Sequence, residues 1–139
     1  MNGISYYNSE RYPDPTAYAG LTAAIKAEKA KHYKPVVYIC SPYSGNIKLN
    51  TANARRYCRY AVDKGYIPLA PQLFFPQFIS EETERETAMF MNYVLLTKCK
   101  ELWVFGNKIT AGMAEEIEKA KQRDIKIRYF TDEIKEVCK

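Results

Sequence analysis

The sequence contains few residues of the kinds that hold metal ions. It has one histidine in 139 residues, and its four cysteines, Cys40, Cys58, Cys99 and Cys138, form no C-x-x-C pair. A zinc site needs several such ligands at close spacing, so we expect no structural metal. The first three cysteines lie within apolar patterns, which is typical of small buried residues.

Long apolar segments are also missing. No run of about 20 apolar residues occurs, as a membrane-spanning helix would require. The first residues, MNGISYYNSERYPDP, are polar and aromatic and lack the apolar core of a signal peptide. We therefore expect a cytoplasmic protein with no membrane partner.

Two nucleotide-binding motifs are absent as well. The chain contains neither G-x-G-x-x-G nor G-x-x-x-x-G-K-[ST], which excludes a standard dinucleotide fingerprint and a P-loop. We expect no cofactor.

The net charge of +5 raises the question of nucleic-acid binding. Arg55, Arg56 and Arg59 form a mild basic cluster, but elsewhere basic and acidic residues alternate and form no block of one sign. This pattern favours a solvated helix face over a track for a phosphate backbone. We therefore do not expect nucleic acid as a partner.

The sequence does contain an alternation of apolar runs and helical patterns. Its length and its 47% hydrophobic content fit one compact domain. Short apolar runs predict strands at 36–40, 66–71, 101–106 and 125–130. Helical patterns fall at 17–33, 50–66, 82–99 and 111–123, with a last helical turn or two at 131–138. The alternation predicts an α/β fold, a doubly wound Rossmann-like or flavodoxin-like sandwich with a mainly parallel sheet of four to five strands.

The same patterns divide the chain into two parts. Residues 1–33 are predicted to be an N-terminal arm and helix, irregular at its start, and residues 34–139 the α/β domain. Thr16 is the predicted N-cap of the first helix, and Asn50 or Thr51 that of the second.

Ligands of open α/β sheets bind beyond the carboxyl ends of the strands, which selects three loops. The first loop, residues 41–46, carries hydroxyl and amide groups on Ser41, Tyr43, Ser44 and Asn46, and a turn-forming Gly45. Free N–H groups at the start of the next helix favour anions or polar oxygens. The residues are equally consistent with a turn that caps this helix.

The second loop, residues 71–78, is rich in aromatic side chains. Phe74, Phe75 and Phe78 could form a flat apolar wall on which a planar base stacks. Ordinary core packing explains two of the three equally well, so both interpretations stay open.

The third loop, residues 106–112, leads into a helix with two adjacent glutamates. Thr110 is the predicted N-cap, and Gly112 lets a ligand approach the backbone. On a helical wheel Glu116 lies about 60° from Met113, at the edge of the buried stripe, whereas Glu115 points toward solvent. A partly desolvated carboxylate is more basic and more reactive, which suits attack on an anomeric carbon. The dipole of the helix is an alternative reason for an acid near its start.

These segments resemble the nucleoside 2-deoxyribosyltransferase-like superfamily, and within it the small bacterial and phage domains of unassigned function. The resemblance covers about Lys34 to Phe130 and rests on four segments, VVYICSPYSGN, ARRYCRYAVDKGYIPLAP, LLTKCKELWVFG and ITAGMAEEIEKAKQRDIKIRYF. Its most specific element is the G-x-x-x-E of Gly112–Glu116, which opens a helix directly after a strand. The resemblance implies a nucleoside-like ligand and a homodimer or higher homo-oligomer.

The resemblance also implies roles for individual residues. In characterised members of that superfamily the glutamate of the motif is the nucleophile, and it forms a covalent glycosyl–enzyme intermediate at C1′. This role would belong to Glu116, with Thr110 helping to hold the substrate and Tyr43 in a loop that contributes to binding. Asn92 stands where many relatives have an acid, and Gln72 where a histidine is common.

The leading hypothesis is an enzyme that acts on the N-glycosidic bond of a nucleoside or nucleotide, as a hydrolase or a deoxyribosyltransferase. Glu116 attacks C1′, while Tyr43 and Asn92 position the sugar and the nucleophile. The other predicted binding residues are Ser41, Ser44, Gly45, Asn46, Gln72, Phe74, Phe75, Thr110, Gly112 and Met113. The alternative is a non-catalytic nucleotide sensor with the same pocket.

Overall fold

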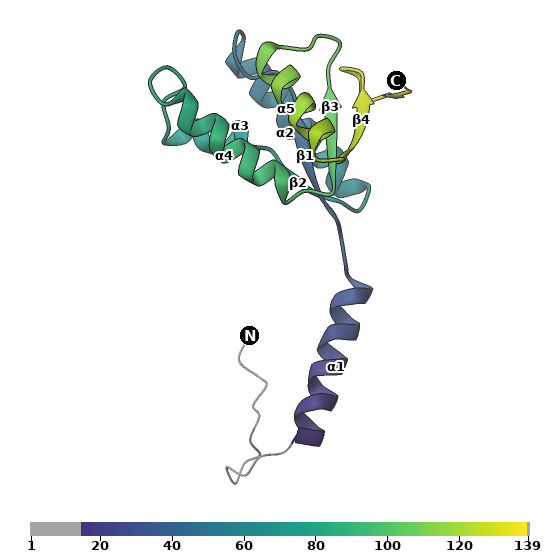
Figure 1. The fold of residues 1–139 in the computed structure, drawn as a ribbon. Coiled ribbons are helices and arrows are strands. Elements are labelled where there is room, and N and C mark those ends of the chain that lie inside the picture. The colour runs from purple at the N-terminus through teal and green to yellow at the C-terminus, as the bar shows by residue number, and fades with distance from the viewer. Residues whose placement is uncertain (1–14, 139) are drawn as a thin grey trace. The chain divides into compact units, whose positions relative to one another are not determined.

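A computed structural model describes residues 15–138 of the chain (Figure 1). These residues divide into two units, the first ending at Tyr33 and the second beginning at Lys34. The first unit contains helix α1, Pro15–Lys31. The helix begins one residue before Thr16, so Thr16 is not the residue preceding the helix as predicted. Proline suits a first helical position because its fixed φ is helical and the N–H it lacks would be unpaired there. The predicted irregular start lies outside the described residues.

The second unit is built on a five-stranded sheet of order β2-β1-β3-β4-β5. The strands are β1 (Val36–Cys40), β2 (Ile67–Leu69), β3 (Glu101–Phe105), β4 (Lys126–Phe130) and β5 (Glu136–Val137). The first four are parallel, and β5 pairs antiparallel with β4. The predicted fold class is confirmed. The order is that of flavodoxin-like folds, in which the ligand crevice opens where β1 and β3 lie side by side.

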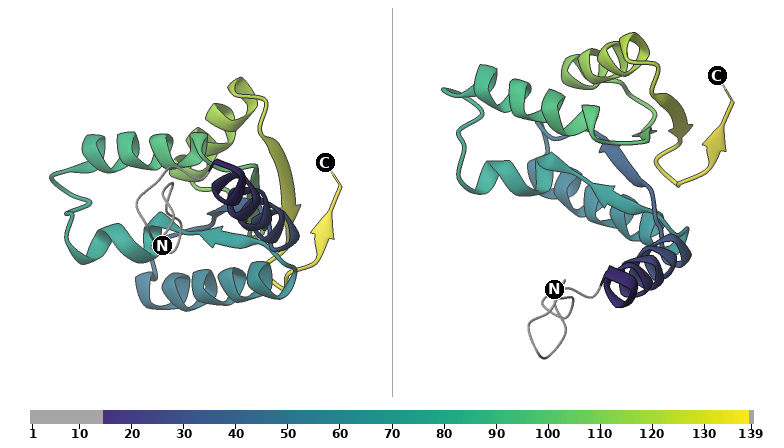
Figure 2. Two further views of the ribbon diagram at one scale, coloured as in Figure 1. Left: turned by 90° about the horizontal axis from the view of Figure 1, so that it is seen from below. Right: turned by 60° about the horizontal axis from the view of Figure 1, so that its bottom comes forward.

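Helices cover both faces of the sheet, with α4 (Arg85–Thr97) and α5 (Ala111–Gln122) on one face and α2 (Ile47–Asp63) on the other (Figure 2). Alternation along β1 separates the two cores, because successive side chains of a strand point to opposite faces. Tyr38 and Cys40 pack with residues of α4 and α5, whereas Val37 and Ile39 pack with residues of α2.

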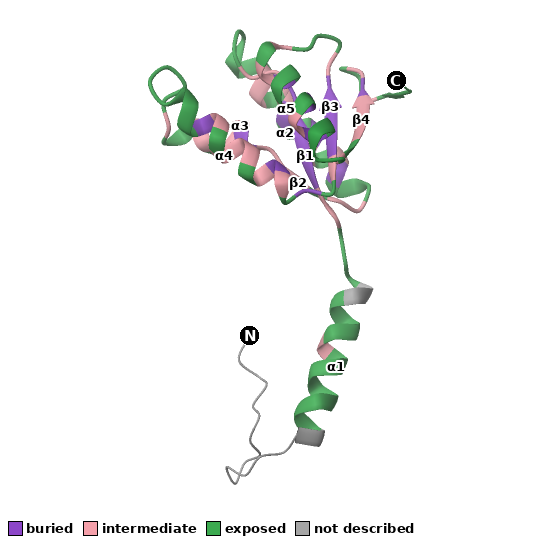
Figure 3. Ribbon diagram, in the orientation of Figure 1, coloured by how far each residue is buried: buried purple, intermediate pink, exposed green. Residues whose placement is uncertain are grey.

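Aromatic rings dominate the core beneath α2. Phe105 stacks on Tyr57 and on Phe130, with ring centroids 4.2 and 4.7 Å apart, and Trp103 fills the space beside them. Such pairs add about 0.5–1.5 kcal/mol each beyond their buried area. Strands β1 and β3 are buried along most of their length (Figure 3), so they form a rigid support for the loops at their carboxyl ends.

Helix α2 begins earlier than predicted. Asn46 is its N-cap, and the side-chain oxygen of Asn46 accepts a hydrogen bond from the backbone N–H of Leu49 at 3.2 Å. Asn50 and Thr51, the predicted caps, lie within the helix. Asparagine is a favoured N-cap at either position. The conformation of the preceding loop determines which of the two asparagines lies at the N-terminus of the helix.

Two further segments differ from the predictions. The second loop contains a helical turn, α3 (Pro71–Phe74), and a 3₁₀ turn, η1 (Phe75–Gln77). The segment 131–138 was predicted to be helical, yet its end forms strand β5. A helix of this length is marginal, whereas pairing with β4 supplies partners for the backbone. None of the helices within residues 15–138 is long and apolar enough to cross a membrane.

Candidate active site

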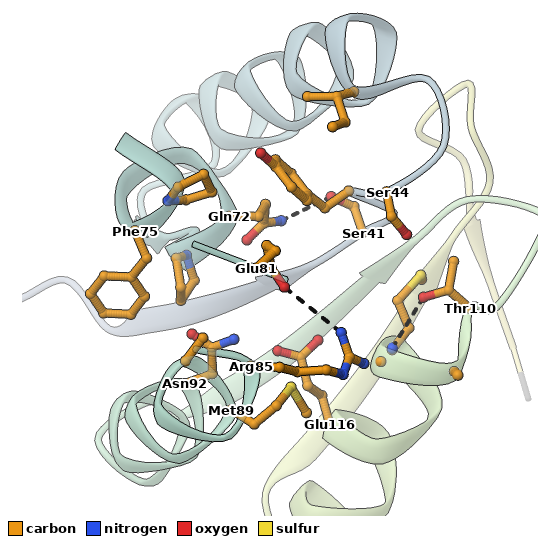
Figure 4. A pocket seen from close by; sticks show the side chains of 18 of the residues that line it. Ser41, Ser44, Gln72, Phe75, Glu81, Arg85, Met89, Asn92, Thr110 and Glu116 are labelled. Carbon is orange, nitrogen blue, oxygen red and sulfur yellow. Dashed lines mark hydrogen bonds and ion pairs between the residues drawn. The ribbon is translucent and has the colours of Figure 1, made fainter. Parts of the chain in front are cut away.

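A cleft of about 410 Å³ opens at the carboxyl ends of β1 and β3 (Figure 4). This volume lies within the range typical of small-molecule sites, about 300–1,000 Å³. Its walls come from all three predicted loops and from one face of α4. The predicted site residues that line it are Ser41, Tyr43, Ser44, Gln72, Phe75, Asn92, Thr110, Gly112, Met113 and Glu116.

Three predicted residues do not line the cleft. Gly45 is exposed, with a φ of +94°, and serves the turn before α2. Asn46 caps α2 as described above. Phe74 is 59% exposed and packs edge-on against Phe78, so that of the two neighbouring rings only Phe75 contributes to the cleft.

Glu116 reaches the cleft from the second turn of α5, and its carboxylate points into it (Figure 4). Two donors on β1 hold the carboxylate from behind. The hydroxyl of Tyr38 donates to Oε2 of Glu116, and the thiol of Cys40 donates to Oε1 across 3.4 Å. Because Tyr38 and Cys40 are two residues apart, both point to the face of the sheet that α5 covers.

Burial raises the pKa of Glu116 from its ordinary value of 4.5 to about 6. The hydrogen bonds from Tyr38 and Cys40 act in the opposite direction, since they favour the charged form. The charge of Glu115 raises the pKa further and that of Lys119 lowers it. The balance leaves Glu116 mostly ionised at neutral pH, yet more basic than an ordinary glutamate.

Glu115 lies on the opposite side of the helix, as the wheel predicted. Its side chain is exposed and lies 3.6 Å from the ammonium of Lys119, one turn further along α5. Such exposed pairs contribute little to stability. The two adjacent glutamates are therefore chemically different groups.

The first loop is held in place by amide side chains. Nε2 of Gln72 donates to the backbone oxygen of Ile39 at 3.1 Å and to Oγ of Ser41 at 3.0 Å. Nδ2 of Asn50 donates to the backbone oxygens of Tyr43 and Ser44 at 3.1 and 2.9 Å. The loop thus presents its hydroxyl groups to the cleft in a defined arrangement.

The start of α5 is held by its cap. Oγ1 of Thr110 accepts a hydrogen bond from the N–H of Met113 at 3.2 Å, as the sequence predicted. A Cβ added to Gly112 would meet no atom within 4 Å, so protein packing does not require glycine there. The open space beside Gly112 instead belongs to the cleft.

A carboxylate on the β4–β5 turn supports the loop that precedes α5. Asp132 accepts hydrogen bonds from the backbone N–H and the side-chain amide of Asn107, at 3.2 and 3.0 Å. Gly106 has a φ of +114°, and a Cβ there would lie 3.2 Å from Oδ1 of Asp132. A side chain at Gly106 would therefore disturb both the backbone and this contact.

Sequence reasoning missed several residues of the site. The sequence patterns predict Tyr38 only as a strand residue and Cys40 only as a small buried strand residue, although a buried tyrosine hydroxyl usually requires a partner. Arg85 and Met89 line the cleft with Asn92, and their i, i+4, i+7 spacing on α4 was a signal that could have identified this wall.

The α4 wall contributes both charge and polarity. Arg85 pairs with Glu81 across 3.7 Å at the cleft (Figure 4), and Glu82 lies beside them. Oδ1 of Asn92 is buried and has no hydrogen-bond partner among residues 15–138. Within the same residues, no three His, Cys, Asp or Glu side chains gather closely enough to hold a metal ion.

Comparisons with known proteins agree with this architecture. Residues 35–130 match the family model described as "Domain of unknown function (DUF7768)", and the chain belongs to this family. No curated protein matches the sequence. A solved structure of a 2-deoxyribosyltransferase from the psychrotolerant bacterium Bacillus psychrosaccharolyticus is similar in fold, with a TM-score of 0.54 and 17% identity over 75% of this chain and 77% of that one.

Proposed function

We propose that this member of the DUF7768 family cleaves the N-glycosidic bond of a nucleoside or nucleotide, with Glu116 as the nucleophile. The observation that supports this proposal most is the state of the Glu116 carboxylate. It is desolvated, held from behind by Tyr38 and Cys40, and open to a cleft of about 410 Å³. A carboxylate so placed can attack a carbon without first being released from solvent.

The reaction has two steps. An oxygen of the Glu116 carboxylate forms a bond to the sugar C1′ as the C1′–N bond breaks, and the electron pair of that bond leaves with the base, which takes up a proton from solvent. The glycosyl ester is then attacked at C1′ by water, which regenerates the carboxylate and releases the sugar and a proton. In a transferase, a second base replaces water in this step.

The other cleft residues have roles in binding. Ser44 and Tyr43 line the cleft, and we assign them to binding of the sugar; Ser41 is oriented by Gln72. Phe75 offers a ring surface on which a base can stack. Asn92 lies on the wall opposite the first loop, where its amide can orient the sugar (Figure 4).

The similarity to a 2-deoxyribosyltransferase supports the proposal at the level of the fold. A flavodoxin-like sheet places ligands beyond β1 and β3, where this cleft lies. Hydrolysis and transfer share the first step, so both follow from the same nucleophile.

The test is a panel of ribonucleosides, 2′-deoxynucleosides and their 5′-phosphates, in which base release is measured by chromatography with and without an acceptor base. We expect release by the wild type, none by Glu116→Gln, and normal release by the matched control Glu115→Gln. Intact mass spectrometry of the wild type should show a glycosyl adduct that Glu116→Gln lacks.

Two outcomes would contradict the proposal. Equal base release by the wild type and Glu116→Gln would remove Glu116 from the chemistry. Binding of a nucleotide to both proteins with no release by either, measured by calorimetry, would establish the sensor function instead.

A further inference from the structure

A buried thiol lies directly behind the proposed nucleophile. Cys40, the last residue of β1, is 1% exposed, and its sulfur lies 3.4 Å from Oε1 of Glu116. Because it does not line the cleft, it cannot contact a substrate there. The reaction described above assigns it no step.

We propose that Cys40 is a positioning residue for Glu116: its thiol proton is donated to Oε1, so that each carboxylate oxygen has its own donor on β1. This inference rests on the proposed function of Glu116. Tyr38 fixes Oε2 and Cys40 fixes Oε1, and the two contacts together define the rotation of the carboxylate about its last bond.

The geometry identifies Glu116 as the acceptor for this thiol. Within residues 15–138 the thiol has one further acceptor, the backbone oxygen of Met113, which lies 3.9 Å from the sulfur and is uncharged. Burial raises the pKa of the Cys40 thiol well above its usual range, and the neighbouring Glu116 raises it further. The thiol therefore keeps its proton and can donate it.

A thiol suits this position for a chemical reason. It is a weaker donor than a hydroxyl, so it orients an oxygen while withdrawing little of the negative charge that the attack on C1′ needs. Tyr38 supplies the stronger hydrogen bond to the other oxygen.

Within residues 15–138, five other charged side chains lie near Glu116 or line the same cleft, and none of them forms a hydrogen bond with its carboxylate. They come from α5, from α4 and from the turn before α4. They are Glu115, Lys119, Arg85, Glu81 and Glu82. Replacing Cys40 leaves all of these in place, so a change in the titration of Glu116 would report the lost thiol contact.

The test is a titration of the Glu116 carboxyl by ¹³C NMR in glutamate-labelled protein, with the signal assigned by its loss in Glu116→Gln. We compare the wild type, Cys40→Ala and Cys99→Ala. Cys99 is a matched control because it is 7% exposed, belongs to the same core cluster, and donates to the backbone oxygen of Leu95 instead.

We expect the Glu116 midpoint to move to higher pH by about 0.5 pH unit in Cys40→Ala, because a hydrogen bond to the charged form is lost. Cys99→Ala should titrate like the wild type. The acidic limb of the pH–rate profile for base release should move by the same amount in Cys40→Ala. The kcat should fall, while KM stays close to that of the wild type.

An unchanged Glu116 midpoint in Cys40→Ala overturns the inference, whatever the activity. Absence of base release by every protein overturns the proposed function, while the titration still decides whether the thiol contact exists. If Cys40→Ala does not fold, Cys40→Val, which fills a similar volume without a donor, replaces it in the same comparison.

Discussion

Tyr38 and Glu116, 78 residues apart in the sequence, are joined by a hydrogen bond from the phenol hydroxyl to Oε2 of the carboxylate. Tyr38 lies in the middle of the sheet and Glu116 on a helix that covers it. The contact anchors a group at the cleft to the most rigid part of the domain. Preorganisation of this kind is what a nucleophile requires, because the attack then needs little rearrangement.

The first prediction concerns this hydrogen bond. Tyr38→Phe keeps the ring but removes the donor, so the pKa of Glu116 should rise above its value of about 6. We expect the acidic limb of the pH–rate profile to move upward by about 1 pH unit, the size of a hydrogen bond to a charged group. Tyr57→Phe, on the opposite face of the sheet, is the control and should leave the limb unchanged. Identical limbs in all three proteins would show that Glu116 does not govern the profile.

The second prediction concerns stability. The folded protein binds the Glu116 proton more tightly than the unfolded chain does, since the pKa is about 6 instead of 4.5. The resulting stabilisation is present below pH 4.5 and is lost as the pH rises through 6. Glutamine does not titrate, so the variant Glu116→Gln does not lose this stabilisation as the pH rises. The free energy of unfolding of Glu116→Gln relative to that of the wild type should therefore increase by about 2 kcal/mol between pH 4.5 and pH 7.5.

Urea denaturation at both pH values measures this difference. The control Glu115→Gln changes an exposed residue and should alter the free energy of unfolding by less than about 1 kcal/mol at either pH. A difference between Glu116→Gln and the wild type that does not depend on pH would mean that Glu116 is not desolvated.

The third prediction concerns the different roles of two adjacent aromatic residues, Phe74 and Phe75. Phe75 lines the cleft, whereas Phe74 is exposed and does not. Phe75→Ala should weaken nucleoside binding about tenfold, because stacking of a base on an aromatic ring contributes about 1–3 kcal/mol. Phe74→Ala should leave the affinity within about twofold. Calorimetric titration in a Glu116→Ala background, where no turnover occurs, gives both values, and equal losses would argue against stacking on Phe75.

The fourth prediction concerns the start of α5. Thr110→Ala removes the oxygen that accepts from the N–H of Met113, and the free energy of unfolding should fall by about 1 kcal/mol. Thr110→Ser retains the hydroxyl and should restore most of this stability. Because Glu116 is carried by the same helix, base release should fall in Thr110→Ala more than in Thr110→Ser. Equal denaturation midpoints for the two variants would show that the cap contributes nothing.

Much of the fold follows from local patterns. The apolar run Val36–Cys40 is a strand with the predicted bounds, and the helix after β3 begins after the predicted cap, Thr110. The exposed Glu115 and the cleft-facing Glu116 also agree with the helical wheel. These features depend on backbone periodicity, which neighbouring residues determine.

Other features depend on which segments meet in three dimensions. Asn46, and not Asn50, caps α2. The side chain of Asn50 instead donates hydrogen bonds to the backbone oxygens of Tyr43 and Ser44. Residues 136–137 form a strand because the edge of β4 offers backbone partners that no local pattern reveals.

The α/β architecture and the direction in which Glu116 points therefore follow from local sequence patterns. The contacts of Tyr38 and Cys40 with its carboxylate, and of Gln72 with Ser41, arise only when the domain packs. The physical reason is distance along the chain: periodicity determines the face on which a side chain lies, whereas the partner of a buried polar group depends on how the sheet and its helices pack.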